Sequence, residues 1–153
     1  MGEFTYTRAT DRDIPFIAQV YAENMAQLHG VPRDWETWAQ LLADPAAEYY
    51  IVREKAPVAW FRVDEEDGGF WLGMLQVMPD FHRRGIGRLV LSAAERMARE
   101  KGYSKVGIHT TEDNLPARGL YLSAGYAVTE IGPCTTADGV DRVGYTFEKE
   151  IAG

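Results

Sequence analysis

The chain has 153 residues, of which 46% are apolar, which is enough for one domain with one core and excludes a disordered chain. Its 23 acidic and 16 basic side chains give a net charge of −7, which argues against nucleic acid as a partner and favours cationic ligands. A single cysteine, Cys134, excludes an internal disulfide and a cysteine-rich metal site. Because no apolar run could cross a membrane and residues 1–13 lack a secretory signal, we expect a cytoplasmic protein.

The periodicity of the apolar residues predicts a succession of strands and helices. Thr10 and Asp34 are typical of helix starts, and Gly102 and Gly125 of helix ends. The expected strands cover residues 3–8, 48–53, 58–64, 70–77, 105–110, 126–131 and 142–151, and the expected helices run from Thr10 to Gly30, from Asp34 to before Pro45, from the loop at 79–85 to Gly102, and from Asn114 to Gly125. A loop is expected around Cys134. The order β-α-α-β-β-β-α-β-α-β-β predicts an α/β or α+β sandwich, a hairpin-rich mixed sheet with helices on its faces.

Aromatic side chains are concentrated in the first half of the chain, at Tyr21, Trp35, Trp38, Tyr49 and Tyr50. They could line a substrate pocket or build the core, and their helical spacing favours the core. We therefore expect these rings to pack inside the protein.

A basic loop with two glycines separates the strand at 70–77 from the next helix. Gly85 and Gly87 leave the N–H groups of the first helical turn open, at the positive end of the helix dipole. Three positive charges accompany them, those of Arg83, Arg84 and Arg88. This turn is typical of phosphate or pyrophosphate binding, although solvated arginines on an ordinary turn would give the same pattern. The dinucleotide fingerprint is excluded because Val90 occupies the place of its third glycine, and the P-loop because no Lys-Ser/Thr pair follows.

Two motifs extend this observation. The first, V-x-P-x-x-R/Q-x-x-G-x-G/A, is present as Val77-Met78-Pro79-Asp80-Phe81-His82-Arg83-Arg84-Gly85-Ile86-Gly87. The second, N-x-x-A-x-x-L-Y-x-x-x-G-F/Y, is met by Asn114, Ala117, Leu120, Tyr121, Gly125 and Tyr126. With both motifs in this order, the chain resembles the GNAT superfamily of acetyl-CoA-dependent N-acetyltransferases over nearly its whole length. His82 departs from the pattern, since Arg or Gln is usual at that position.

The resemblance implies one GNAT-type domain over residues 1–153, with a mixed, mostly antiparallel sheet of about seven strands and helices on both faces. It also implies that acetyl-CoA is the acetyl donor and lies where the fourth and fifth strands splay. The pantetheine arm would pair with the backbone near Leu75 and Val77, and the Val77 N–H would face the acetyl oxygen, where negative charge develops. The cofactor-binding residues implied are Leu75, Val77, His82, Arg83, Arg84, Gly85, Ile86, Gly87, Arg88, Asn114 and Tyr121.

Asn114 and Tyr121 are also catalytic residues in this resemblance. Asn114 would hydrogen-bond near the cofactor arm, and it could cap its own helix at the same time. Tyr121 would point its hydroxyl at the leaving sulfur as the general acid, because a phenol of pKa about 10 suits a thiolate leaving group. A core tyrosine with a satisfied hydroxyl is the alternative.

The base that accepts the proton of the amine is left open. Many relatives carry Glu or His on the fourth strand, but residues 70–77 contain no titratable side chain. His109 is the best single candidate for this catalytic role. The others are Glu23, His29, Glu112 and Asp113, acting directly or through water. Cys134 lacks an evident paired base, so direct transfer is preferred to an acetyl-cysteine.

The sequence therefore predicts an N-acetyltransferase that moves an acetyl group from acetyl-CoA to a primary amine by direct attack in a ternary complex. The net negative charge favours a small-molecule amine over a protein N-terminus. The alternative is a non-catalytic acyl-CoA-binding regulatory module. No metal, nucleic acid or membrane partner is expected, and a homodimer is left open.

Overall fold

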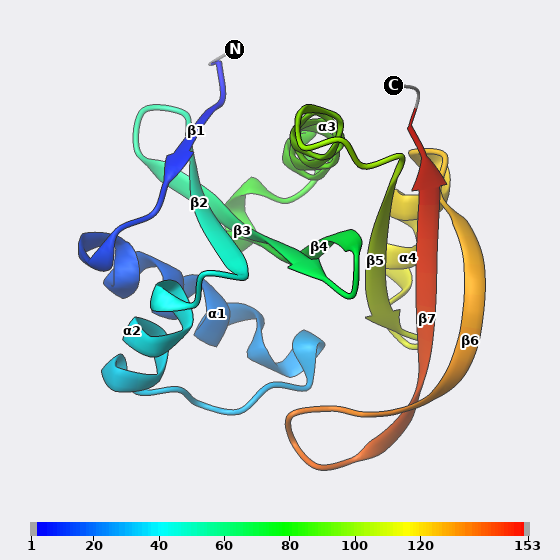
Figure 1. The fold of residues 1–153 in the computed structure, drawn as a ribbon. Helices are drawn as coiled ribbons and strands as arrows, with labels where there is room; N and C mark the ends of the chain where they lie inside the picture. The colour runs from blue at the N-terminus through cyan, green and yellow to red at the C-terminus, as the bar shows by residue number, and fades with distance from the viewer. Residues whose placement is uncertain (1–2, 152–153) are drawn as a thin grey trace.

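The structure is a computed structural model that describes residues 3–151, and a sheet of seven strands in the order β1-β2-β3-β4-β5-β7-β6 forms its centre (Figure 1). The strands are β1 Thr5–Arg8, β2 Ala47–Arg53, β3 Pro57–Glu66, β4 Gly69–Val77, β5 Lys105–Thr111, β6 Ala127–Thr135 and β7 Asp141–Glu150. Neighbouring strands are antiparallel except β4 and β5, which run parallel. The predicted mixed, mostly antiparallel sheet is therefore confirmed.

Helices cover both faces of the sheet, as expected. They are α1 Ile14–Leu28, α2 Trp35–Ala43, α3 Ile86–Glu100 and α4 Leu115–Ser123, with short 3₁₀ turns η1 Asp11–Asp13 and η2 Pro79–Phe81. On one face α1 and α2 bury a cluster that includes Ile17, Trp38 and Trp60. On the other face α3 and α4 bury a larger cluster around Val90 and Phe147. Within the described residues no helix is both long enough and apolar enough to span a membrane.

The first helix ends two residues before the glycine that the sequence suggested. Thr10 does act as a cap, in a capping box with Asp13, but it caps η1, which leads directly into α1. At the other end His29, rather than Gly30, takes the left-handed conformation with φ 54°. The ring of His29 is hydrogen-bonded to Asp113, with Nε2 and Oδ2 2.7 Å apart, a contact that a glycine in that position could not make.

The aromatic residues of the first half mostly pack inside, as predicted. Tyr21, Trp38 and Tyr49 are buried, and the rings of Tyr21 and Trp38 meet edge to face at 5.2 Å. Tyr50 stacks on Phe61 on the opposite face of the sheet. The prediction is wrong for Trp35, the first residue of α2, which is 55% exposed because Trp38 occupies the buried face of that helix.

The loop expected around Cys134 is also wrong, because β6 continues to Thr135. Cys134 pairs with Arg142 of β7, and Thr135 pairs with Asp141. The proline in this segment, Pro133, is tolerated because β6 is an edge strand. The longer hairpin places Cys134 on the sheet.

Candidate active site

The sheet opens between β4 and β5. These strands pair at two positions only, the second of which joins Leu72 and Ile108. Beyond it β4 stays with β3, and β5 stays with β7, so the two halves of the sheet separate. Gly73 is an extra residue of β4 at this point, a β-bulge, and a Cβ there would collide with the ion pair of Arg62 and Asp64. A larger residue where the sheet splits would therefore displace this ion pair.

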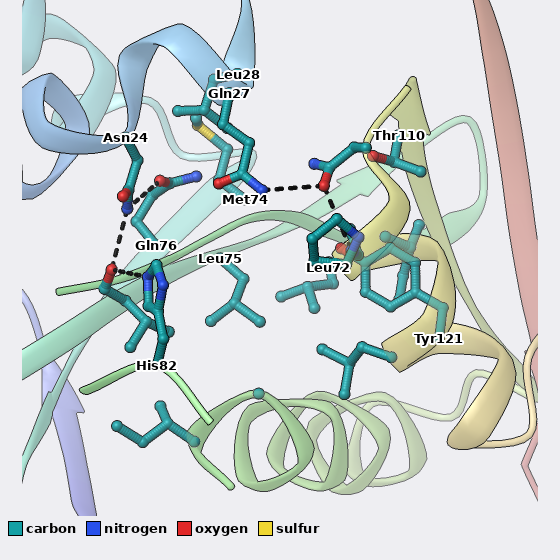
Figure 2. A pocket seen from close by; sticks show the side chains of 18 of the residues that line it. Asn24, Gln27, Leu28, Leu72, Met74, Leu75, Gln76, His82, Thr110 and Tyr121 are labelled. Atoms are coloured by element: carbon teal, nitrogen blue, oxygen red, sulfur yellow. Dashed lines mark hydrogen bonds between the residues drawn. The ribbon is translucent and has the colours of Figure 1, made fainter. Parts of the chain in front are cut away.

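Past the bulge, β4 turns unpaired backbone groups toward the opening. The N–H of Met78 donates to β3, so the alternation of an antiparallel ladder directs the backbone groups of Leu75 and Val77 to the other side. The Val77 carbonyl accepts hydrogen bonds from Asn24 Nδ2 and His82 Nε2, both at 3.0 Å (Figure 2). The Val77 N–H lies on that same edge and is directed into the cleft.

The loop after β4 leads to an uncapped helix start. Gly85, the N-cap residue of α3, has φ 81° and provides no side chain to the first turn. Arg83 is also left-handed, with φ 66°. A Cβ on Gly85 would meet no protein atom within 4 Å, so the space beside this turn is open. The first N–H groups of α3 are therefore available to an anion.

Both features border one cavity of about 610 Å³ between α1, β4, α3, β5 and α4. In Figure 2, Asn24, Gln76 and His82 lie together at one end, and Thr110 and Tyr121 lie at the other. The sequence-predicted residues that line the cavity are Leu75, Val77, His82, Arg83, Gly85, Ile86, Gly87, Arg88, His109, Asn114 and Tyr121. The splay of the strands and the basic loop thus meet at one site.

The three arginines of the loop have different surroundings. Arg83 and Arg88 line the cavity, and Arg88 also donates to the Ser123 carbonyl and hydroxyl. Arg84 is not among the lining residues. Its guanidinium pairs with Glu54 at 2.9 Å, beside the β2–β3 turn. The charge that the sequence assigned to one cluster is therefore divided between the cavity and the protein surface.

Asn114 caps α4 and also lines the cavity. Its Oδ1 accepts from the Ala117 N–H, which caps α4, and from Gln27 Nε2 of α1, both at 3.3 Å. Tyr121 lies two turns further along α4 and is only 7% exposed. Burial raises the pKa of the Tyr121 hydroxyl to about 12, so it keeps its proton at neutral pH.

His109 lies at the junction of β5 with the cavity. Its ring stacks on Trp71 with centroids 4.6 Å apart, and its Nδ1 is 3.1 Å from Thr146 Oγ1. The four other base candidates do not line the cavity: Glu23, His29, Glu112 and Asp113. Two of these, His29 and Asp113, are already paired with each other. His109 is therefore the candidate that the geometry favours.

Sequence reasoning missed the polar residues that support the site. Gln76, only 3% exposed, accepts from Asn24 Nδ2 at 3.1 Å and so helps to position the hydrogen bond to Val77. Gln27 and Thr110 line the cavity from α1 and β5. A glutamine inside an otherwise apolar strand was the signal that could have indicated Gln76, whereas the others depend on how α1 packs against the sheet.

Because the Tyr121 hydroxyl is buried, the free energy of unfolding should fall as the pH becomes alkaline. With a folded pKa of about 12 against about 10 when unfolded, its contribution is complete below pH 10 and is lost as the pH rises from 10 to 12. At pH 11 this loss is about 1.4 kcal/mol of unfolding free energy. Urea unfolding at pH 8 and pH 11 should show this extra loss in the wild type and not in Tyr121→Phe. An equal pH dependence in both proteins would contradict it.

Comparison with known proteins identifies the family. Residues 14–126 match the model of the Acetyltransferase (GNAT) family. The chain belongs to this family. A curated relative, the chloroplastic GCN5-related N-acetyltransferase 7 of Arabidopsis thaliana, is 29% identical over 72 residues, which are 47% of this chain and 26% of that protein. The matched part of the GNAT chain thus spans about a quarter of the relative.

Solved structures agree on the GNAT fold. A protein assigned as a phosphinothricin N-acetyltransferase has a TM-score of 0.84 at 17% identity, over 99% of this chain and 100% of that one. The ribosomal-protein-S18-alanine N-acetyltransferase of Escherichia coli has a TM-score of 0.76 at 19% identity, over 99% of this chain and 97% of that one. The yncA protein of Salmonella typhimurium is assigned as an acetyltransferase and was solved with acetyl-CoA. It has a TM-score of 0.75 at 17% identity, over 96% of this chain and 93% of that one. The expectation of acetyl-CoA as the family's donor is confirmed.

Proposed function

We propose that this GNAT protein transfers the acetyl group of acetyl-CoA to a primary amine, by direct attack within a ternary complex. The observation that carries the proposal is the joining, in one cavity, of the free backbone edge of β4 with the open first turn of α3. A thioester with a long amide-containing arm and a diphosphate needs both features. The family membership gives the class of reaction.

The residues present fit acetyl-CoA. The backbone groups of Leu75 face the cleft and can pair with the amides of an extended arm, as another strand would, which leaves the Val77 N–H for the acetyl group. The first turn of α3 and the Arg83 and Arg88 side chains supply N–H donors and positive charge for the diphosphate. When bound, acetyl-CoA supplies an activated acyl group that is transferred with release of its thiol.

Two groups of the chain assist at the reacting centre. The Val77 N–H, fixed by its strand, donates to the carbonyl oxygen as negative charge develops there. The nitrogen of the amine bonds to the acetyl carbon, and the bond from that carbon to sulfur breaks. The Tyr121 hydroxyl then gives its proton to the departing sulfur. Burial raises the pKa of this hydroxyl to about 12, so it is a weaker acid than an exposed tyrosine and gives up its proton only as negative charge develops on the sulfur.

His109 is the proposed base, so its replacement should lower the activity toward the amine. The ring stands between Trp71 and Thr146, with Nδ1 at Thr146, so Nε2 is the nitrogen left for the proton of the amine. Glutamine can keep a hydrogen bond to Thr146 but cannot take up that proton. We expect His109→Gln to lower kcat/KM for the amine about 100-fold in steady-state assays with saturating acetyl-CoA.

A matched variant tests whether this effect is specific to His109. His29→Gln removes a histidine that lies outside the cavity and is paired with Asp113. We expect it to cost far less than His109→Gln. Equal losses in both variants, or a His109→Gln enzyme with wild-type activity, would remove His109 from the proposed mechanism.

Thiol release tests the function as a whole. With acetyl-CoA and a panel of primary amines, a transferase releases thiol in an amine-dependent way, whereas a silent acyl-CoA-binding module binds the donor without doing so. Intact-mass spectrometry after incubation with acetyl-CoA alone should show an unmodified chain. An added acetyl group on Cys134 would instead support a two-step route.

The acceptor proposed is a small-molecule amine. The net charge of −7 favours a cationic ligand. A panel that includes short peptides with free N-termini would test this, and a preference for the peptides would contradict it.

A further inference from the structure

A second cavity of about 340 Å³ adjoins the first. His109 and Thr110 line both cavities, so the proposed base stands where the two meet. The second cavity lies over β5, β7 and β6, beyond the acetyl-CoA cleft. An acceptor whose amine reaches His109 from this side would have its remaining atoms in the second cavity.

Two facing glycines form the floor of this cavity. Gly132 of β6 pairs directly with Gly144 of β7. Glycines inside strands lower stability and often mark a place where another group comes close to the backbone. A Cβ on Gly132 would meet no atom within 4 Å, so the packing of the protein itself does not require this glycine. Cys134 Sγ lies beside Gly144, 3.1 Å from where a Cβ on Gly144 would be, so the hollow that is suited to a ligand lies over Gly132.

A row of three side chains crosses the sheet beside this hollow. His109 of β5 pairs with Thr146 of β7, which in turn pairs with Glu130 of β6. Directly opposed residues of antiparallel strands point to the same face, so all three side chains share it. Two strand spacings separate the outer members by about 10 Å. A carboxylate thus stands at a fixed distance from the proposed base.

The charge of Glu130 is not neutralised by the protein. Within residues 3–151, Glu130 has neither an ion-pair nor a hydrogen-bond partner, and it lines the second cavity. Glu148, its neighbour on β7, is instead paired with Lys105 at 3.1 Å. Glu130 is therefore the carboxylate of this cavity that can pair with a cation from solution.

Building on the proposed function, we infer that the second cavity binds the body of the acceptor and that Glu130 binds a second ammonium group on it. The substrate class is then a small linear diamine. One nitrogen loses its proton to His109 and attacks the acetyl carbon, while the other stays protonated beside Glu130. A four-carbon diamine, with a hydrogen bond at each end, spans about 12 Å when extended and about 10 Å when slightly bent.

A pair of probes of nearly equal length tests this inference. 1,4-Diaminobutane carries the second ammonium, and n-pentylamine replaces it with a methyl group. With wild-type enzyme and saturating acetyl-CoA, kcat/KM should be about fivefold higher for the diamine, a factor of about two from its two equivalent amino groups and the rest from a partly exposed ion pair. Glu130→Gln should lower the ratio of the two values to about two.

Two further variants make the result decisive. Glu150→Gln removes one negative charge from the far end of β7, outside both cavities, and should keep the wild-type ratio. Gly132→Val fills the hollow, where the added atoms meet no protein atom at Cβ, and should lower kcat/KM for both amines with unchanged acetyl-CoA affinity by calorimetry. Either a wild-type ratio of about two or less, or an unchanged ratio in Glu130→Gln, would overturn the inference. If no amine released thiol although acetyl-CoA bound, the proposed function itself would fail.

Discussion

Gly85→Val is expected to weaken acetyl-CoA binding at least about 100-fold, because charge-assisted hydrogen bonds of 1.5–3 kcal/mol each are lost when a side chain enters the open space at the first turn of α3. Isothermal titration calorimetry measures this directly. The variant also forces a β-branched residue into a left-handed conformation, with φ 81°, so its stability should fall by roughly 1–2 kcal/mol.

Gly102→Val separates these two effects. Gly102 follows the other end of α3, has φ 88°, and a Cβ there also meets no atom within 4 Å, but it does not line the cavity. We expect a similar loss of stability with wild-type affinity for acetyl-CoA. Gly87 would be a poorer choice, because a Cβ at that position comes within 2.7 Å of Leu120 and disturbs the contact between α3 and α4. Wild-type affinity in Gly85→Val would refute the proposed diphosphate site.

Tyr121→Phe should lower kcat about 100-fold while leaving the affinity for acetyl-CoA nearly unchanged. The ring remains, so the packing of α4 against Phe147 is kept, and only the hydroxyl that protonates the sulfur is lost. Steady-state kinetics gives kcat, and calorimetry gives the affinity. If instead affinity fell and kcat stayed, the hydroxyl would be a binding group.

Tyr103→Phe is the matched control for removing one tyrosine hydroxyl. Tyr103 donates its hydroxyl hydrogen bond to Glu65 and does not line the cavity. Its replacement should leave kcat at the wild-type value. Equal kcat in wild type and Tyr121→Phe would remove Tyr121 from the mechanism.

The fold was largely predictable because local rules and global packing agree. Asp34 and Asn114 cap their helices with side-chain oxygens, and Gly102 and Gly125 take left-handed conformations where helices end. Two of the three errors arose where tertiary contacts override local preference. The contact of His29 with Asp113 accompanies the shifted helix end, and cross-strand pairing carried β6 through Cys134.

The site was predictable where it is local and unpredictable where it depends on packing. The first turn of α3 follows from adjacent residues, so Gly85 and its arginines could be identified from the sequence. Whether an arginine side chain faces the cavity, as Arg83 does, or a distant glutamate, as Arg84 does, depends on where β2 lies. The row from His109 to Glu130 depends on the register of three strands, which no local pattern specifies.

Two side-chain contacts join the end of α1 to the start of α4 beside the cavity, the hydrogen bond from Gln27 to Asn114 (Figure 2) and the contact of His29 with Asp113 at 2.7 Å. Hydrogen bonds of this kind contribute only about 1–3 kcal/mol each, so thermal motion breaks both in a small fraction of molecules at any moment. The donor can therefore reach its cleft when these two contacts break, without a hinge movement of whole helices. Turnover in this protein should accordingly be limited by bond making or thiol departure rather than by a slow opening of the scaffold.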